Sequence, residues 1–92
     1  MIDKLQGIEA RYEELNRLMA ESAEDYGKVA EYAKERSSLE EIVAAFREYQ
    51  SVLKDAGEAR GWLANAEMKA LAEAELPGLE QRQAELEARL KD

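Results

Sequence analysis

The sequence contains no cysteine and no histidine, and it has one proline, one phenylalanine and one tryptophan in 92 residues. Without cysteine there is no disulfide, thiolate nucleophile or thiolate metal ligand, which fits a reducing compartment. Without histidine the chain lacks the commonest general base, the commonest metal ligand and any histidine phosphotransfer role. Long apolar runs are missing too, so the sequence predicts no membrane-spanning helix. These absences argue against most catalytic and membrane classes of protein.

Acidic residues outnumber basic residues by 21 to 13, which gives a formal net charge of −8. A surface of this sign repels nucleic-acid phosphate and anionic membranes, so we expect neither as a direct partner. It favours a protein partner with a basic patch, although the same charge also serves simply to keep helices in solution. Acidic residues run through the opening stretch as well, which excludes a signal peptide and argues against a membrane-docking helix.

Strong helix formers dominate the composition, so the chain is predicted to be all-α. A first helix is expected over residues 2–20, because apolar side chains recur there at steps of three and four. This stripe consists of Leu5, Ile8, Tyr12, Leu15, Leu18 and Met19. Ser22 and Asp25 match the capping-box spacing, which predicts that a second helix begins at residue 23 and continues to about residue 63.

The second helix carries a seam for another helix, with steps of four and three. The seam consists of Ile42, Phe46, Tyr49, Leu53 and Ala56. Asn65 is the expected N-cap of a third helix over residues 66–91. Its stripe consists of Met68, Leu71, Leu76, Leu79, Leu86 and Leu90, with Ala72 and Gln83 in register. Pro77 either kinks this helix or breaks it in two, and the constant phase of the stripe favours a kink.

Short connections make successive helices antiparallel. The predicted architecture is therefore an antiparallel three-helix bundle, in which helices two and three form a long coiled-coil-like hairpin. The first helix is much shorter than the second and is expected to cover only part of that hairpin.

No group of residues has the pattern of a catalytic or metal site. A nucleophile–base pair would need histidine or cysteine. The adjacent acids Glu13-Glu14 and Glu40-Glu41 diverge by about 100° on a helix, so neither pair converges on one site. The five glycines are scattered singly and form no phosphate loop. We therefore predict no catalytic, cofactor-binding or metal-binding residues, and the binding residues stay unassigned.

Aromatic side chains stand mostly at helical spacing, and packing in the core is the expected role for them. They are Tyr12, Tyr26, Tyr32, Phe46, Tyr49 and Trp62. Tyr32 lies beside the main stripe, and Trp62, near a helix end, is expected to be half exposed and open to a partner. Arg36 interrupts the stripe of the second helix, so it is expected to snorkel outward or to pair with a carboxylate across the bundle.

Three stretches of the chain also match a known family in order and spacing. They are Met1-Ile2-Asp3-Lys4-Leu5 with Ile8-Glu9 and Tyr12-Glu13-Glu14-Leu15, then Leu39-Glu40 to Phe46-Arg47-Glu48-Tyr49, then Glu67-Met68 to Glu75-Leu76. Together they resemble the N-terminal helical domain of bacterial peptide chain release factor 1, a class I release factor. Asn65-Ala66 and Ala23 depart from the family's usual Asp-Pro, which affects the turns. Residues 35–40 would also suit release factor 2, which stays an alternative.

The resemblance implies that residues 1–92 are the non-catalytic first domain of a longer cytoplasmic factor that terminates translation at UAA and UAG. The codon-reading domain and the domain with the Gly-Gly-Gln loop, which promotes peptidyl-tRNA hydrolysis, are absent from these residues. The resemblance further implies docking, through proteins, at the stalk base and GTPase-associated region of the large ribosomal subunit. Release factor 3 is a second candidate partner, and no cofactor is implied. An unrelated acidic helical adaptor or scaffold is the alternative.

Overall fold

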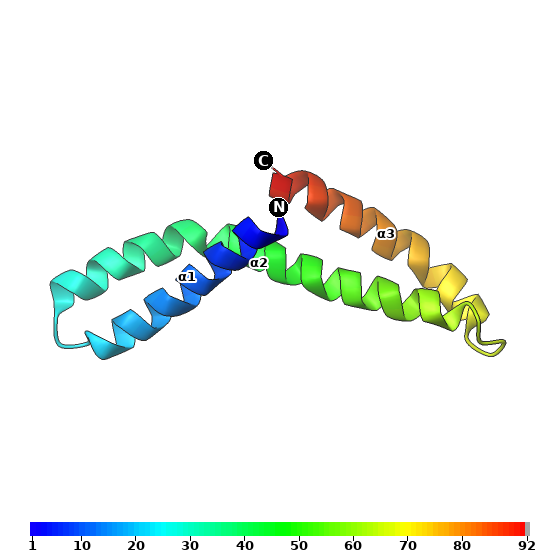
Figure 1. Cartoon of the computed structure of the whole chain (residues 1–92), viewed down its shortest axis with the longest axis horizontal. Helices are drawn as coiled ribbons and strands as arrows, with labels where there is room; N and C mark the ends of the chain where they lie inside the picture. Colours follow the sequence, from blue (N-terminus) through cyan, green and yellow to red (C-terminus); the bar gives the residue numbers. More distant parts are fainter. Residues whose placement is uncertain (92) are drawn as a thin grey trace. The chain divides into compact units, whose positions relative to one another are not determined.

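The computed structural model describes residues 1–91 and consists of three helices joined by two short turns (Figure 1). The helices are α1 (Ile2–Glu21), α2 (Tyr26–Trp62) and α3 (Lys69–Lys91). Residues 1–91 contain no strand. The predicted all-α class and the three helices are therefore confirmed.

The helices pack as two units that share α2. The first unit, Met1–Ala44, contains α1 and the first part of α2, and the second unit begins at Ala45 and contains the rest of α2 with α3. In each unit the shorter helix runs back along its own part of α2, as a helical hairpin (Figure 1). This division of α2 between two partners was not predicted, because periodicity shows which face of a helix is buried but not which neighbour buries it.

The buried face of α1 is the predicted stripe. Leu5 and Leu15 are fully buried, and the remaining stripe residues are half-buried. Burial of a leucine side chain contributes roughly 1.5–3 kcal/mol relative to leaving it in water. The stripe therefore holds α1 in the first unit, as predicted.

The seam of the second unit follows the predicted period with two corrections. Its buried residues are Ala45, Phe46, Tyr49, Val52, Ala56 and Ala59 on α2, with Ala72, Leu76, Leu86 and Leu90 on α3. The predictions that Leu53 and Leu71 are core residues are wrong, because these side chains are 36% and 44% exposed. One residue turns a helix by about 100°, so Val52 and Ala72 take the inward positions beside them.

The turn between α1 and α2 differs from the predicted capping box. Ser22 closes α1, since its N–H donates to the Leu18 carbonyl at 2.9 Å. Asp25 begins α2 instead: its Oδ1 accepts the Lys28 N–H at 3.1 Å, and its carbonyl accepts the Val29 N–H at 3.0 Å. The prediction that the second helix begins at residue 23 is therefore wrong by three residues, because Ser22 is the C-cap of α1 and Asp25 supplies the N-cap of α2.

The turn between α2 and α3 is capped as predicted. The side-chain Oδ1 of Asn65 accepts the N–H groups of Glu67 at 2.9 Å and Met68 at 3.3 Å. Regular helix begins at Lys69, and residues 66–68 form a turn that leads into it. The N-cap prediction is confirmed, and the predicted start at residue 66 falls three residues early.

Pro77 lies inside α3, which runs unbroken from Lys69 to Lys91. A proline in this position cannot donate to the carbonyl of Glu73, one turn earlier. Pro77 and Glu73 are both exposed, so water can satisfy that carbonyl. A break into two helices does not occur, and the kink stays a prediction.

Candidate interaction surfaces

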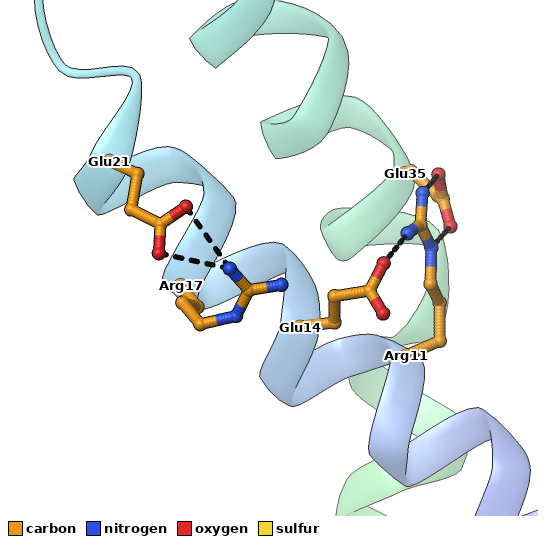
Figure 2. Close-up of polar contacts among 5 residues, drawn as sticks. All are labelled: Arg11, Glu14, Arg17, Glu21 and Glu35. Atoms are coloured by element: carbon orange, nitrogen blue, oxygen red, sulfur yellow. Dashed lines mark hydrogen bonds and ion pairs between the residues drawn. The ribbon is translucent and has the colours of Figure 1, made fainter.

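In the first unit, Arg11 on α1 and Glu35 on α2 form a bidentate ion pair, and we call such a cross-helix Arg–Glu pair a clamp (Figure 2). The guanidinium of Arg11 donates from Nε to Glu35 Oε2 at 2.6 Å and from Nη2 to Glu35 Oε1 at 2.8 Å, and its Nη1 contacts Glu14. Six residues further along α1, Arg17 donates to Glu21 at 2.9 and 3.0 Å. Bidentate pairing of this kind fixes geometry more than it adds stability at a partly exposed site. The clamp is therefore a specific contact of α1 with α2 in this register.

Arg36 makes its cross-helix contact with an aromatic ring. Its guanidinium carbon lies 5.1 Å from the centre of the Tyr12 ring on α1, and its Nη1 lies 3.6 Å from Glu40 on its own helix. The contact of Arg36 across the helix pair is thus with a tyrosine ring, and its carboxylate contact lies on its own helix. A cation over the face of an aromatic ring is attracted by the ring quadrupole. Arg36 thus adds a second polar contact to the α1–α2 seam.

The second unit has a matching clamp between α2 and α3. Arg82 donates to Glu48 at 2.6 and 2.7 Å and to Glu85 at 3.1 Å. Close by in the same unit, the buried Tyr49 donates its hydroxyl to Glu87 at 3.1 Å, and the Gln83 amide donates to the same oxygen at 3.0 Å. Burial, together with the Glu87 carboxylate, raises the pKa of Tyr49. The Glu87 carboxylate thus satisfies the Tyr49 hydroxyl and the Gln83 amide nitrogen and leaves the tyrosine neutral, whereas Gln83 Oε1 is buried without a hydrogen-bond partner among the described residues.

The clamp carboxylates are held in their charged form. Hydrogen bonding from Arg11 lowers the pKa of Glu35, and hydrogen bonding from Arg82 lowers the pKa of Glu48. Glu87 also has a lowered pKa, chiefly because Gln83 donates to it and then because Tyr49 does. A general acid or base needs a pKa near the working pH, and these shifts run away from neutrality. The polar groups of both seams therefore hold helices together.

The lowered pKa values predict a pH dependence of stability. A carboxyl whose pKa is lower in the folded chain than the ordinary 4.5 contributes stability above that value and loses it as the pH falls through the folded pKa. We expect the double variant Glu35→Gln/Glu48→Gln to melt at a lower temperature than the parent at neutral pH. The difference should shrink towards zero in acid, as measured by circular dichroism at a series of pH values.

Exposed glutamates supply the control for this experiment. Glu31→Gln/Glu58→Gln removes the same charge from two exposed positions of α2. It should not reproduce the loss at neutral pH. If the clamp variant instead differs from the parent by the same amount at every pH, the carboxylates are not titrating as their contacts require.

The turn that links α1 to α2 carries the most exposed aromatic residue of the chain. We call residues 20–28 the α1–α2 end. Tyr26, the first residue of α2, is 84% exposed, so the prediction that it packs in the core is wrong. The turn before it encloses a shallow depression of about 420 Å³, lined by residues 20–25 and Lys28. Three carboxylates and one ammonium group lie on this lining, which makes the α1–α2 end acidic.

The other aromatic residues lie as expected. Phe46 and Tyr49 are buried, and Tyr12, Tyr32 and Trp62 are half-buried. Tyr26 directly follows the Asp25 N-cap and is the first residue of α2. Its place in the sequence pattern gave no signal of its exposure.

The described residues also limit what the surface can bind. Within residues 1–91 no three acidic side chains gather closely enough to hold a metal ion. None of the three helices, over the same residues, combines the length and apolarity needed to cross a membrane. The described surface carries an acidic end with the exposed Tyr26 and, in each unit, one helix pair joined by an Arg–Glu clamp.

Comparison with known proteins places this domain in a family. The PCRF domain family matches residues 8–92. Peptide chain release factor 1 of Acidobacterium capsulatum is 45% identical over 95 residues, which cover 99% of this chain and 26% of that protein. The release factor 1 proteins of Myxococcus xanthus and Bacillus cytotoxicus are 42% and 40% identical over the same share of this chain. No solved structure gives a significant match.

The chain therefore belongs to the PCRF domain family. It spans about a quarter of the length of the curated relatives that it matches. Those relatives are bacterial peptide chain release factor 1 proteins, so the resemblance read from the sequence is confirmed.

Proposed function

We propose that residues 1–92 act as the non-catalytic first domain of a peptide chain release factor 1, which directs translation termination at UAA and UAG in the cytoplasm. The observation that carries the proposal is the match of the PCRF domain over residues 8–92, with 45% identity to a release factor 1 over 99% of the chain. In this proposal, codon reading and peptidyl-tRNA hydrolysis belong to further domains of the same protein. The reported relatives bear the type 1 name, which favours it over release factor 2.

The chemistry of the surface supports a docking role for the domain. Its best-formed polar contacts, Arg11–Glu35 and Arg82–Glu48, join helices to each other. The buried Tyr49 hydroxyl is engaged by Glu87. Catalysis needs a reactive group poised beside a space for substrate, and these groups are occupied by structural contacts. The proposal therefore assigns no chemical step to this domain.

We propose that the α1–α2 end carries the docking. An exposed aromatic ring bordered by charge is the composition of an interaction hot spot, because tyrosine buries a large area on binding at low cost in side-chain entropy. The carboxylates around it complement a basic protein surface. The partner proposed is the protein-lined stalk base and GTPase-associated region of the large ribosomal subunit, with release factor 3 as a second partner.

This docking proposal predicts a loss of binding from a single substitution. Tyr26→Ala is expected to weaken association with large ribosomal subunits by roughly tenfold or more, as an anchor residue does. Co-sedimentation of the chain with purified subunits measures the effect. The fold should be unaffected, because 84% of the Tyr26 side chain already lies in solvent.

Leu71→Ala provides the matched control, since it removes an exposed large apolar side chain from the second unit. It should leave co-sedimentation unchanged. Equal binding by Tyr26→Ala and the parent would show that the α1–α2 end does not dock. Absence of binding by the parent chain would contradict ribosome docking altogether.

A further inference from the structure

We propose that the loop-proximal part of the second unit opens locally while the rest of its hairpin stays folded. This part, which we call the hairpin end, runs from Gly57 on α2, through the turn, to Leu76 on α3. Three independent features of the described residues converge on it: backbone propensity, packing and cross-helix ion pairing.

Two glycines weaken α2 in the hairpin end. Gly57 and Gly61 both lie in helical backbone, and a Cβ added to either would meet no packed neighbour within 4 Å among the described residues. Neither a left-handed turn nor a close helix approach therefore requires glycine here. Relative to alanine, each glycine disfavours the helix about four- to fivefold. On α3, Pro77 directly follows the last residue of the hairpin end. It has no backbone N–H, so one helical hydrogen bond is missing there.

The packing also weakens towards the turn. In the hairpin end the buried residues of the seam are the small side chains Ala59 and Ala72 and, at its last position, Leu76, whereas Leu63 and Leu71 are exposed. Trp62 and Met68 are half-buried. In the remainder of the second unit the seam buries five large side chains, Phe46, Tyr49, Val52, Leu86 and Leu90, together with Ala45 and Ala56. Because apolar stabilisation scales with the area removed from water, the hairpin end has less of it per residue.

Cross-helix ion pairing follows the same gradient. Arg60 and Glu80 approach only to 3.8 Å, with about half of each side chain exposed. Outside the hairpin end, Arg82 binds Glu48 with two hydrogen bonds of 2.6 and 2.7 Å. A bidentate pair is stronger than one long exposed contact. Elements with few buried contacts open at lower free energy than the whole domain.

Such an opening would change the conformation of the hairpin end while the rest of the domain stays folded. Opening would expose the apolar side chains of Ala59, Trp62 and Ala72, while Tyr49, Leu86 and the Arg82–Glu48 clamp hold the remainder of the hairpin. Trp62 is the single tryptophan of the chain, so its fluorescence reports on this segment alone.

Hydrogen exchange of the whole 92-residue chain tests the proposal. Amides of residues 58–62 and 72–76 are expected to exchange at least tenfold faster than those of residues 46–56. In the double variant Gly57→Ala/Gly61→Ala, exchange in both segments should slow by roughly tenfold or more, since two glycine penalties are removed. Slower amide exchange on α3, which carries no substitution, would show that the two helix ends open together. Quenching of Trp62 by acrylamide should fall in the same variant.

Gly7→Ala is the matched control, because Gly7 is a helical glycine with the same open surroundings in the first unit. It should leave exchange in residues 58–76 unchanged. Uniform exchange along the second unit of the parent chain would overturn the proposal. So would a double variant in which only α2 is protected, because that result describes simple fraying of one helix end.

Discussion

Leu15→Asp is expected to detach α1 and to abolish the first unit. The Leu15 side chain is 0% exposed, so the substitution removes a fully buried leucine and leaves a carboxylate in its place. Truncation of a buried leucine alone costs about 2–5 kcal/mol, and an unpaired buried charge adds to that loss. Since small domains are stable by only about 5–15 kcal/mol, helical signal from the 20 residues of α1 should disappear. Far-UV circular dichroism during thermal unfolding measures both the signal and the midpoint.

Ala10→Asp is the control for Leu15→Asp. It places the same carboxylate in the same helix at an exposed position, where the expected cost is about 1 kcal/mol from helix propensity and neighbouring acids. Leu15→Ala should fall between the two variants. A melting curve of Leu15→Asp that matches that of Ala10→Asp would show that the α1 stripe is not a core.

The α1 stripe shows how much of the fold the sequence could predict. A helix with one apolar face must bury that face, so Leu5 and Leu15 were correctly assigned to the core before any partner was known. The Arg11–Glu35 clamp could not be predicted in the same way. It depends on the register of α1 against α2, which is set by packing over the whole seam and leaves no mark in the spacing of either helix.

The errors on α2 have a common physical origin. Val52 and Leu53 are adjacent and both apolar, and each fits a pattern of steps of three and four between Tyr49 and Ala56; the sequence analysis assigns Leu53 to the seam, whereas the structure buries Val52. At the start of α2, Ser22 and Asp25 are both good caps, and only the chain path after α1 decides between them. Where two neighbouring residues can serve the same role, propensity does not choose, and the tertiary fold does.

The candidate docking surface was missed for the same reason. Once Asp25 caps α2, Tyr26 stands at the first helical position and in solvent, beside the acidic turn. An incorrect cap moved it into the predicted core. The hydrophobic pattern identifies buried residues, and an exposed aromatic residue is one that falls outside it. For Tyr26 this depends on where α2 begins, and the predicted start was three residues too early.

Phe46→Ala is expected to have the largest effect in the second part of α2. Phe46 is 1% exposed and is among the largest fully buried side chains of the described residues. Loss of a buried phenylalanine ring costs about 3–5 kcal/mol, because the transfer free energy is lost and the surrounding side chains collapse only in part into the space. The free energy of unfolding, measured by urea titration with circular dichroism, should fall by that amount.

Tyr26→Ala removes an aromatic ring of similar size from the first turn of the same helix and is the matched control. Its ring is largely in water in the folded chain, so its loss should change the free energy of unfolding by less than about 0.5 kcal/mol. The two variants should therefore separate the two roles of aromatic residues on α2. Phe46→Ala loses stability, whereas Tyr26→Ala keeps stability and loses ribosome association. Similar stability losses in both variants would contradict the burial assigned to Phe46, because aromatic content rather than packing would then determine the effect.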